Sequence, residues 1–128
     1  MVISDMFDKQ KADWIDALIF SNYRQGKSKL RQKVNDTDRF CCLGVLCDIQ
    51  EDVQWVNEDE DNYNNVVYMD PTIRLENGDK CRIGGMGMLT QEGMNMFGLN
   101  ESQVNQLVDL NDNGSSFEQI AEWIRINV

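Results

Sequence analysis

The feature that most constrains the fold is Phe40–Gln50, FCCLGVLCDIQ, the one nearly continuous apolar run in the chain. Such a run must be buried, as a strand or as a helix, and its periodicity does not decide between the two. Gly44 and the small cysteine side chains would let a helix pack closely against its neighbours. We therefore predict a buried helix that begins near Arg39, with Asp36 or Asp38 as its N-cap.

The chain has four cysteines, Cys41, Cys42, Cys47 and Cys81, and three of them fall within this run. A secreted disulfide framework would instead spread its cysteines through a loop-rich chain. Structural zinc sites with four cysteines usually use two C-x₂₋₄-C pairs, whereas the spacing here is Cys-Cys-x₄-Cys with Cys81 alone. We therefore predict reduced, buried thiols, with no metal and no cofactor.

With 128 residues, of which 41% are hydrophobic and 27% charged, the chain is long enough and apolar enough to bury one core. We predict a single domain over residues 1–128. No stretch approaches the roughly 18 apolar residues of a membrane span. The first residues also lack the apolar run of a signal peptide. We therefore expect a cytoplasmic protein.

The spacing of apolar residues predicts helices at both ends of the chain. In the first, over about residues 4–21, Ile15, Ile19 and Phe20 widen the apolar arc, so we expect this helix to be covered on more than one side. Three short helices end the chain, and each follows a residue that can cap its N-terminus: Thr90, Asn100 and Ser116. The last two caps have a glutamine three residues later, which completes a capping box.

The middle of the chain is predicted to form a small sheet. The segment NVVYMD, which ends at Pro71, is typical of a strand. Asn77-Gly78 predicts a hairpin with a type I′ turn, which requires a positive φ at both turn residues. A further short strand can form over Lys29–Val34, and the acidic stretch Asp52–Asn65 is expected to be a mobile excursion. The expected fold is α+β, with about five short helices and a small antiparallel sheet in the middle.

The net charge of −10 is unevenly distributed along the chain. Six of the twelve Lys and Arg residues lie between Arg24 and Arg39, where only two acids oppose them. From Asp48 to Asp61 there are seven acids and no base. The overall charge argues against direct binding to nucleic acid or to an anionic membrane, although the local basic segment could hold an anion.

A glycine-rich loop is one candidate ligand site. Gly84, Gly85 and Gly87 come just before the helix that Thr90 caps, so free backbone N–H groups could cradle a phosphate. The loop matches neither a Walker A motif nor G-x-G-x-x-G, and a flexible connector is the simpler interpretation. If the basic segment folded beside the loop, the pair would suit a nucleotide-like anion held by four further residues, Arg24, Lys27, Lys29 and Arg31.

The acidic stretch is a candidate partner-binding surface. Its carboxylates could imitate phosphates and occupy a basic site on another protein, because electrostatic steering depends on the placement of charge. The residues are Glu51, Asp52, Glu58, Asp59, Glu60 and Asp61. A solvated loop is the plainer interpretation.

Histidine is absent, which removes the side chain most used for proton transfer near neutral pH and the commonest metal ligand. An enzyme is therefore disfavoured but not excluded. Asp109–Gly114 imitates the first half of an EF-hand loop, but Ile120 stands where the bidentate Glu should be. We interpret these residues as a polar turn between two helices.

Four segments form a distinctive pattern: W-x-x-A-L from Trp14, Y-R-Q-G from Tyr23, C-C-L-G-V-L-C-D from Cys41 and L-N-D-x-G-x-S-F-x-x-I-A from Leu110. In order and spacing they resemble small phage- and prophage-encoded accessory proteins of unassigned function. The resemblance covers about residues 14–48 and 89–124 and implies an accessory viral gene product, without an activity or a site residue. The polar residues from Tyr23 to Arg31 beside Cys47-Asp48 suggest a shared surface or an internal network.

The leading hypothesis is a non-enzymatic phage accessory protein that binds a host protein in the host cytoplasm, for host takeover or counter-defence. The alternative is a protein that binds or cleaves a nucleotide-like anionic ligand through the basic segment 24–39 and the loop 84–87. A structural or assembly role in the virion is a third hypothesis.

Overall fold

The computed structural model describes residues 8–61, 65–85 and 87–128. Its helices are α1 (Asp8–Phe20), α2 (Cys42–Asp48), α3 (Gln91–Phe97), α4 (Glu101–Asp112) and α5 (Phe117–Asn127). Its strands are β1 (Arg31–Val34), β2 (Thr37–Phe40), β3 (Gln54–Asp61), β4 (Val66–Arg74), β5 (Lys80–Arg82), β6 (Gly84–Gly85) and β7 (Met88–Leu89). The predicted α+β fold is confirmed. Within the described residues, no helix is long and apolar enough to cross a membrane.

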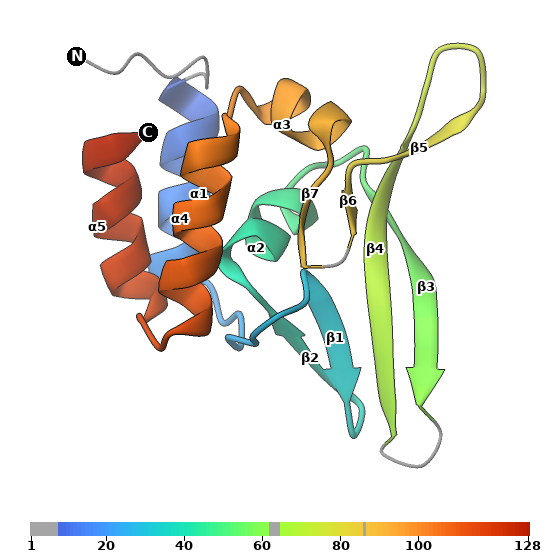
Figure 1. Ribbon diagram of the computed structural model, residues 1–128, viewed down its shortest axis with the longest axis horizontal. Coiled ribbons are helices and arrows are strands. Elements are labelled where there is room, and N and C mark those ends of the chain that lie inside the picture. The colour runs from blue at the N-terminus through green and yellow to red at the C-terminus, as the bar shows by residue number, and fades with distance from the viewer. Residues whose placement is uncertain (1–7, 62–64, 86) are drawn as a thin grey trace.

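The molecule has a helical side and a sheet side, with α2 between them (Figure 1). Helices α1, α4 and α5 stand side by side, and α1 packs against both α5 and α2. The core lies where these helices meet, and Leu107, Ile120 and Ile124 are fully buried there. Trp14 is also fully buried, and its indole Nε1 donates to the Cys42 carbonyl oxygen at 2.9 Å. This bond satisfies the indole N–H and fixes α1 against the start of α2.

The predicted buried helix is confirmed as α2, but its predicted start is wrong. Residues Cys42–Cys47 are all buried, and the N-cap is Cys41, whose Sγ accepts a hydrogen bond from the Gly44 N–H at 3.4 Å. Asp36 lies instead in the turn between β1 and β2, and Asp38 lies in β2. Neither aspartate caps the helix, because both belong to the β1–β2 hairpin. Strand β2 continues to Phe40, so α2 begins only after it.

Two helices contain a glycine at which the backbone of a neighbouring segment approaches closely. A Cβ at Gly44 of α2 would overlap the Leu30 carbonyl oxygen, and one at Gly93 of α3 would overlap the Ile83 carbonyl oxygen. Glycine is helix-destabilising by itself, so its use at these points reflects the close approach of the backbone. The predicted close packing at Gly44 is confirmed.

The main sheet is antiparallel, with strand order β2-β1-β4-β3. Strand β5 pairs with the C-terminal part of β4, from Thr72 to Arg74. The expected strand ending at Pro71 is β4, which continues to Arg74. The expected mobile excursion over Asp52–Asn65 is wrong for its first part, because β3 pairs with β4 from Gln54 to Asp61, with an irregularity between Asn57 and Asp59. The partner strand β4 supplies the backbone hydrogen bonds that the acidic composition did not predict.

The hairpin at Asn77-Gly78 is confirmed, but its predicted turn type is wrong. Only Gly78 has a positive φ, at 90°. The Leu75 carbonyl accepts from the Gly78 N–H, and the Asp79 carbonyl accepts from the Leu75 N–H, so the loop has three residues rather than two. Asn77 Oδ1 accepts from the Asp79 N–H at 2.9 Å, and this local bond favours a different turn.

Two consecutive positive φ angles occur instead in the hairpin between β1 and β2. Asn35 and Asp36 have φ values of 49° and 65° and join Val34 to Thr37. This two-residue connection has the signs of a type I′ turn. Both residue types tolerate the left-handed region better than most, which explains their place at this turn.

The three terminal helices begin at the predicted caps. Thr90 Oγ1 accepts from the Gly93 N–H, and α3 ends at Gly98 with a φ of 69°. Asn100 and Ser116 each form a complete capping box, with Gln103 and Gln119. Helix α1 is described from Asp8, so its expected first turn lies outside the described residues.

The packing at Gly44 generates a test of the fold. Gly44→Ala should lower the free energy of unfolding by about 3 kcal/mol, because the new Cβ forces the Leu30 backbone away from α2. Gly85→Ala is the matched control, since a Cβ there meets its nearest atom at 3.8 Å, and its effect should stay within about 0.5 kcal/mol. Urea denaturation measures both. Equal midpoints for the two variants would contradict the assigned contact.

Candidate binding surfaces

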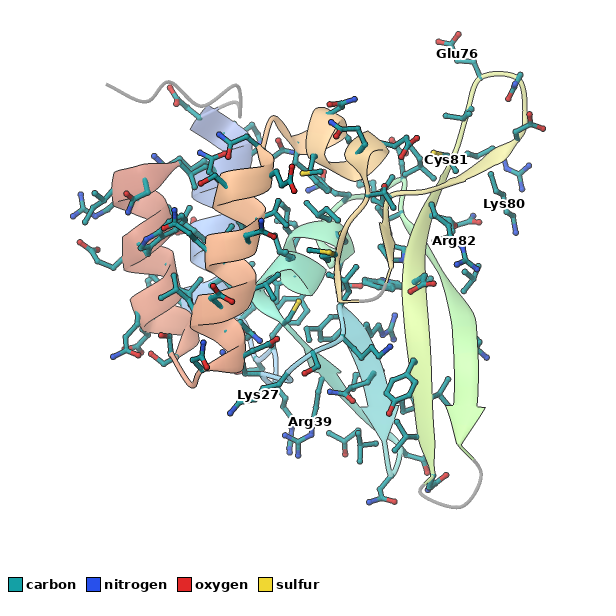
Figure 2. The ribbon with its side chains drawn as sticks, viewed as in Figure 1. Lys27, Arg39, Glu76, Lys80, Cys81 and Arg82 are labelled. Atoms are coloured by element: carbon teal, nitrogen blue, oxygen red, sulfur yellow. The ribbon has the colours of Figure 1, made fainter. Side chains whose placement is uncertain are left out.

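The basic segment does not gather on one surface. Arg24, Lys27 and Arg39 are exposed, and the loop carrying the first two runs beside β2 through backbone bonds to Phe40. A Cβ at Gly26 would lie 3.0 Å from the Arg39 Cβ, which places that arginine against the loop. Lys27 and Arg39 lie near each other beside β2, at the lower edge of the view (Figure 2).

Arg31 lies apart from these exposed bases. Its register opposite Phe40 puts the two side chains on the same face of the hairpin. The guanidinium carbon lies 5.3 Å from the centre of the Phe40 ring and 5.4 Å from that of Trp55. Arg31 Nε also donates to Asp38 Oδ1 at 3.2 Å. Arg31 therefore stabilises the aromatic contact between the hairpin and β3.

The remaining predicted base, Lys29, also contacts an aromatic ring. Its ammonium lies 4.8 Å from the centre of the Tyr68 ring, on β4. The four basic residues predicted to bind one ligand thus divide into two on the exposed loop and two against aromatic side chains.

The basic segment and the glycine loop do lie side by side, but they are packed directly together. A Cβ at Gly87, whose φ is 80°, would overlap the Ser28 carbonyl oxygen, and one at Gly84 would overlap the Leu30 side chain. The loop is itself a small hairpin of β6 and β7. At Gly84 and Gly87 the absence of a side chain therefore serves close packing, and neither glycine lines the groove that Arg24 borders.

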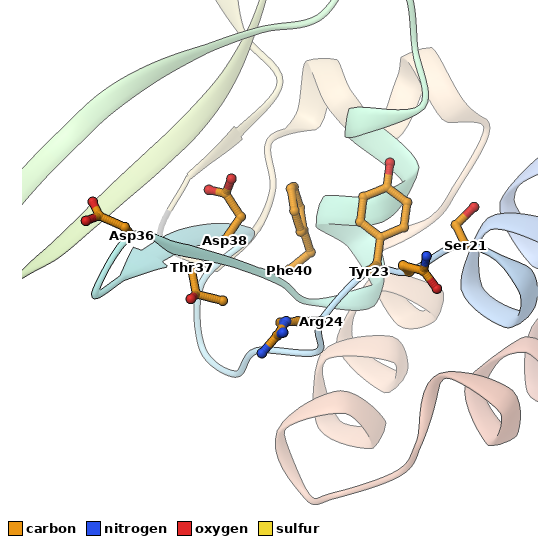
Figure 3. A pocket seen from close by; sticks show the side chains of 8 residues that line it. Ser21, Tyr23, Arg24, Asp36, Thr37, Asp38 and Phe40 are labelled. Atoms are coloured by element: carbon orange, nitrogen blue, oxygen red, sulfur yellow. The ribbon is translucent and has the colours of Figure 1, made fainter.

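That groove, of about 540 Å³, opens at the edge of β2. The Phe40 N–H donates to the Arg24 carbonyl and the Gly26 N–H donates to the Phe40 carbonyl, both at 2.8 Å, so the loop covers one end of this strand. Tyr23, Phe40 and Asp38 rise on one side of β2, with Arg24 and Thr37 on the other (Figure 3). The groove is lined by Ser21, Asn22, Tyr23, Arg24, Asp36, Thr37, Asp38 and Phe40. It combines one guanidinium with two carboxylates, so its charge does not favour an anion alone.

An internal network connects the loop to the C-terminal end of α2. The Tyr23 hydroxyl donates to Asp48 Oδ2 at 2.7 Å, and Trp55 Nε1 donates to Asp48 Oδ1 at 2.9 Å. The Tyr23 and Trp55 rings both contact Phe40 edge to face, with centroids 5.0 and 6.1 Å away. Burial, together with the hydrogen bond to Asp48, raises the pKa of Tyr23 above its ordinary value. Of the two alternatives for Tyr23 and Asp48, the structure places them in an internal network.

The residues that imitate an EF-hand hold the fold together. Asn111 is fully buried, and its Oδ1 accepts from Gln25 Nε2 at 3.0 Å and from the Cys42 N–H at 3.2 Å. Its Nδ2 donates to the Gly26 carbonyl at 2.7 Å. The amide oxygen that would be a calcium ligand is thus used within the protein. The described residues contain no group of three His, Cys, Asp or Glu that could hold a metal.

Three of the four cysteines are buried, as predicted, and Cys81 is half-buried. Burial raises the pKa of the Cys41 thiol to about 11, and it raises the pKa values of Cys42 and Cys47 well above the ordinary value. The thiolate form that reacts and binds metals is therefore suppressed at these three positions.

The acidic stretch divides between a turn and a strand. Glu51 and Asp52 are exposed in the turn that follows α2. Glu58, Asp59, Glu60 and Asp61 belong to β3, and their side chains lie outside the described part of the structure. In the described sheet β3 is the last strand and pairs only with β4. In the described sheet these four residues therefore belong to an edge strand, and Glu51 and Asp52 precede it in the chain.

A groove between α1 and the end of α2 was missed by the sequence analysis. Two neighbouring hollows along α1, of about 440 and 490 Å³, share Asp13 and Ile49 in their linings, and we refer to them together as the groove along α1. They are lined by Lys9, Gln10, Asp13, Asp16, Ala17, Phe20, Ser21, Ile49 and Gln50. The expectation that α1 is covered on more than one side is wrong at its end, where Ile19 is 38% and Phe20 77% exposed. The sequence feature that indicated this groove is the wide apolar arc of α1, to which Ile19 and Phe20 contribute.

Comparison with known families shows a match over almost the whole chain. The model of a domain of unknown function, DUF8296, matches residues 6–128. The chain belongs to this family. The DUF8296 match includes the Asn111 hub, the Tyr23–Asp48 network and the groove along α1, but it brings no activity. No curated protein and no solved structure matches the chain. The function of this DUF8296 protein must therefore be argued from its own surfaces.

The burial of the thiols predicts selective labelling. A thiol reagent at neutral pH should modify Cys81 in the folded protein, while Cys41, Cys42 and Cys47 stay protected because they are buried and their pKa values are raised. Mass spectrometry of labelled peptides, with a sample unfolded in guanidinium as control, measures this. Rapid labelling of any of the three in the native protein would refute it.

The raised pKa of Tyr23 predicts a loss of stability at alkaline pH. The unfolded phenol ionises near pH 10 while the buried one stays neutral, so the contribution of Tyr23 is complete below about pH 10 and is lost as the pH rises further. Urea midpoints measured from pH 7 to 11 should fall more steeply for the parent protein than for Tyr23→Phe. At pH 7 this variant should be less stable by about 1–2 kcal/mol, since Asp48 loses a donor.

The control for that measurement is Tyr68→Phe, which leaves the Tyr23–Asp48 bond intact and should keep the parent pH profile. A Tyr23→Phe profile parallel to that of the parent protein would show that Tyr23 does not couple stability to pH.

Proposed function

We propose that this protein is a non-enzymatic phage accessory protein that binds and modulates a host protein in the host cytoplasm. The phage origin rests on the resemblance of its four sequence segments to phage-encoded accessory proteins. The binding role rests on one structural observation, which is that the most acidic part of the chain forms the edge strand of the sheet.

An acidic edge strand suits a protein partner with basic residues. In the described sheet β3 stands at the edge of the strand order, and the backbone of a strand added at a sheet edge supplies affinity without demanding a particular sequence. The acids between Asp48 and Asp61, unopposed by any base, attract a basic partner and repel acidic ones. Glu51 and Asp52 extend the same charge toward α2.

The polar interior supports a binding role over a catalytic one. The chain lacks histidine. Tyr23 and Asp48 bond to each other, and Arg31 bonds to Asp38. These groups are engaged in holding β2, α2 and β3 together, and such pairs stabilise structure when they are half-buried.

A second candidate function is the binding of a nucleotide-like anionic ligand, and it is favoured by the exposure of Arg24 in the groove at the edge of β2. Asp36 and Asp38 line the same groove and weaken this case. On this alternative ATP would raise the melting temperature of the parent protein but not that of Arg24→Gln. On the host-protein proposal, ATP leaves both unchanged.

Affinity capture from a lysate of the host bacterium tests the role of β3. A variant with Glu58→Gln, Asp59→Asn, Glu60→Gln and Asp61→Asn should retain at least tenfold less of the partner identified by mass spectrometry, because the steering charge is lost. The matched control changes four exposed acids elsewhere, Glu76, Glu92, Glu101 and Glu118, to Gln. Both variants move the net charge from −10 to −6, by four neutralised acids each.

The control should capture the partner as the parent protein does. Equal retention by the two variants would show that overall charge, and not the position of β3, governs binding. Retention of the partner by the β3 variant would exclude this strand as the binding surface.

A further inference from the structure

We propose that the groove between α1 and the C-terminal end of α2 binds a basic amphipathic helix of the partner protein. This inference rests on the proposed function, because it assumes a protein partner, and it adds the place of docking and the kind of segment that docks. It does not depend on β3, so the two can fail separately.

The groove has the dimensions of a helix site. The hollow bordered by Lys9 and the hollow bordered by Phe20 meet at Asp13 and Ile49, so the groove follows α1 over almost its whole length. At a rise of about 1.5 Å per residue, this stretch of α1 is about 16 Å long, which matches about three turns of a second helix. The lining residues of α1 recur at helical spacing, and a second helix laid along them would contact each in turn.

The lining of the groove includes apolar side chains at the Phe20 end. Ala17 and Ile49 line this hollow with Phe20, which is 77% exposed and is the most exposed large hydrophobic residue of the described chain. A single exposed apolar side chain needs no explanation. A phenylalanine at the end of a groove, beside two further apolar side chains, is the arrangement that receives an apolar anchor of a partner helix.

The rim of the groove carries negative charge. Asp13 and Asp16 of α1 line the groove, and the exposed Glu51 and Asp52 follow the lining residue Gln50 directly in the chain. Lys9 is the base in the lining, and it is paired with Asp13 at 2.8 Å. The surplus of carboxylates selects a helix whose polar flanks carry Lys or Arg.

The negative charge of the groove also disfavours the binding of other ligands. Nucleic acid and acidic peptides would be repelled by Asp16 and by the turn at Glu51 and Asp52. An extended strand has its natural place at a sheet edge such as β3, whereas the groove is lined mainly by side chains of α1 and by Ile49 and Gln50, which directly follow α2. The groove is therefore assigned to a helix, and it is continuous with the acidic surface through Gln50 and Glu51.

The test uses two synthetic 14-residue peptides that share one apolar face of leucines at positions i, i+3, i+4 and i+7. One carries Lys at its polar positions and the other carries Glu. Fluorescence anisotropy measures binding to the full chain, and amide chemical shifts locate it. The Lys peptide should bind with shifts confined to α1 and the end of α2, and the Glu peptide should bind at least tenfold more weakly.

Substitutions then separate the groove from the rest of the surface. Phe20→Ser should weaken the Lys peptide about tenfold and leave the melting temperature unchanged, because the side chain is 77% exposed. Ile126→Ser is the matched control on α5, where an isoleucine is 66% exposed away from the groove, and it should not alter binding. Asp16→Asn should weaken binding and reduce its dependence on salt.

The proposal is overturned if the Lys peptide does not bind, if its shifts lie elsewhere, or if Phe20→Ser and Ile126→Ser have equal effects. Applied to the captured host protein, the same variants separate the two proposals. Loss of capture with Phe20→Ser and not with Ile126→Ser supports helix docking. Capture that persists in Phe20→Ser but is lost in the β3 variant overturns the groove and leaves the proposed function standing.

Discussion

The structure depends on the buried side-chain amide of Asn111. Its oxygen and nitrogen both make hydrogen bonds, and these join the end of α4 to Gln25 and Gly26 and to the first free N–H of α2, at Cys42. A buried amide without these hydrogen bonds would lower the stability of the fold. We therefore expect the contacts between the three segments to form together. Segments distant in the sequence thereby acquire one relative position, from which the surfaces of the protein follow.

Once the loop before β1 is held by Asn111, the placement of its neighbours is decided. Tyr23 reaches Asp48, and the hairpin carries Arg31 into the aromatic contact with Phe40 and Trp55. The basic segment is thereby divided and loses the character of a single anion site. The acids are concentrated instead in two places, the turn at Glu51 and Asp52 after α2 and the second half of β3 from Glu58 to Asp61. This contrast supports the proposal of a protein partner over that of a small anion.

The features that could be predicted from sequence are those decided within a few residues. The caps at Asn100 and Ser116 hold because each box closes within one turn, and α2 holds because an apolar run must be buried. The position of the turn at Asn77-Gly78 is predicted correctly but its type is not, since the Asn77 side chain accepts a hydrogen bond from the backbone N–H of Asp79, two residues later. Asp36 is predicted as the N-cap of α2, but it lies in the tight turn between β1 and β2, where it has a positive φ. Of the candidate surfaces, the acidic composition of residues 48–61 is evident from the sequence, whereas the strand that part of it forms and the groove along α1 were not predicted.

By itself the sequence determined the starts of the last three helices, the burial of α2, the buried thiols and the strongly acidic charge, because these depend on local spacing and composition. Only the tertiary structure decided that the acidic stretch becomes strand β3, that Arg31 and Arg24 separate, and that Phe20 stays exposed. The physical reason is that strand pairing and the covering of a helix face depend on partners far along the chain. The residues of a strand or of a helix face do not by themselves specify which distant segment will pack against them.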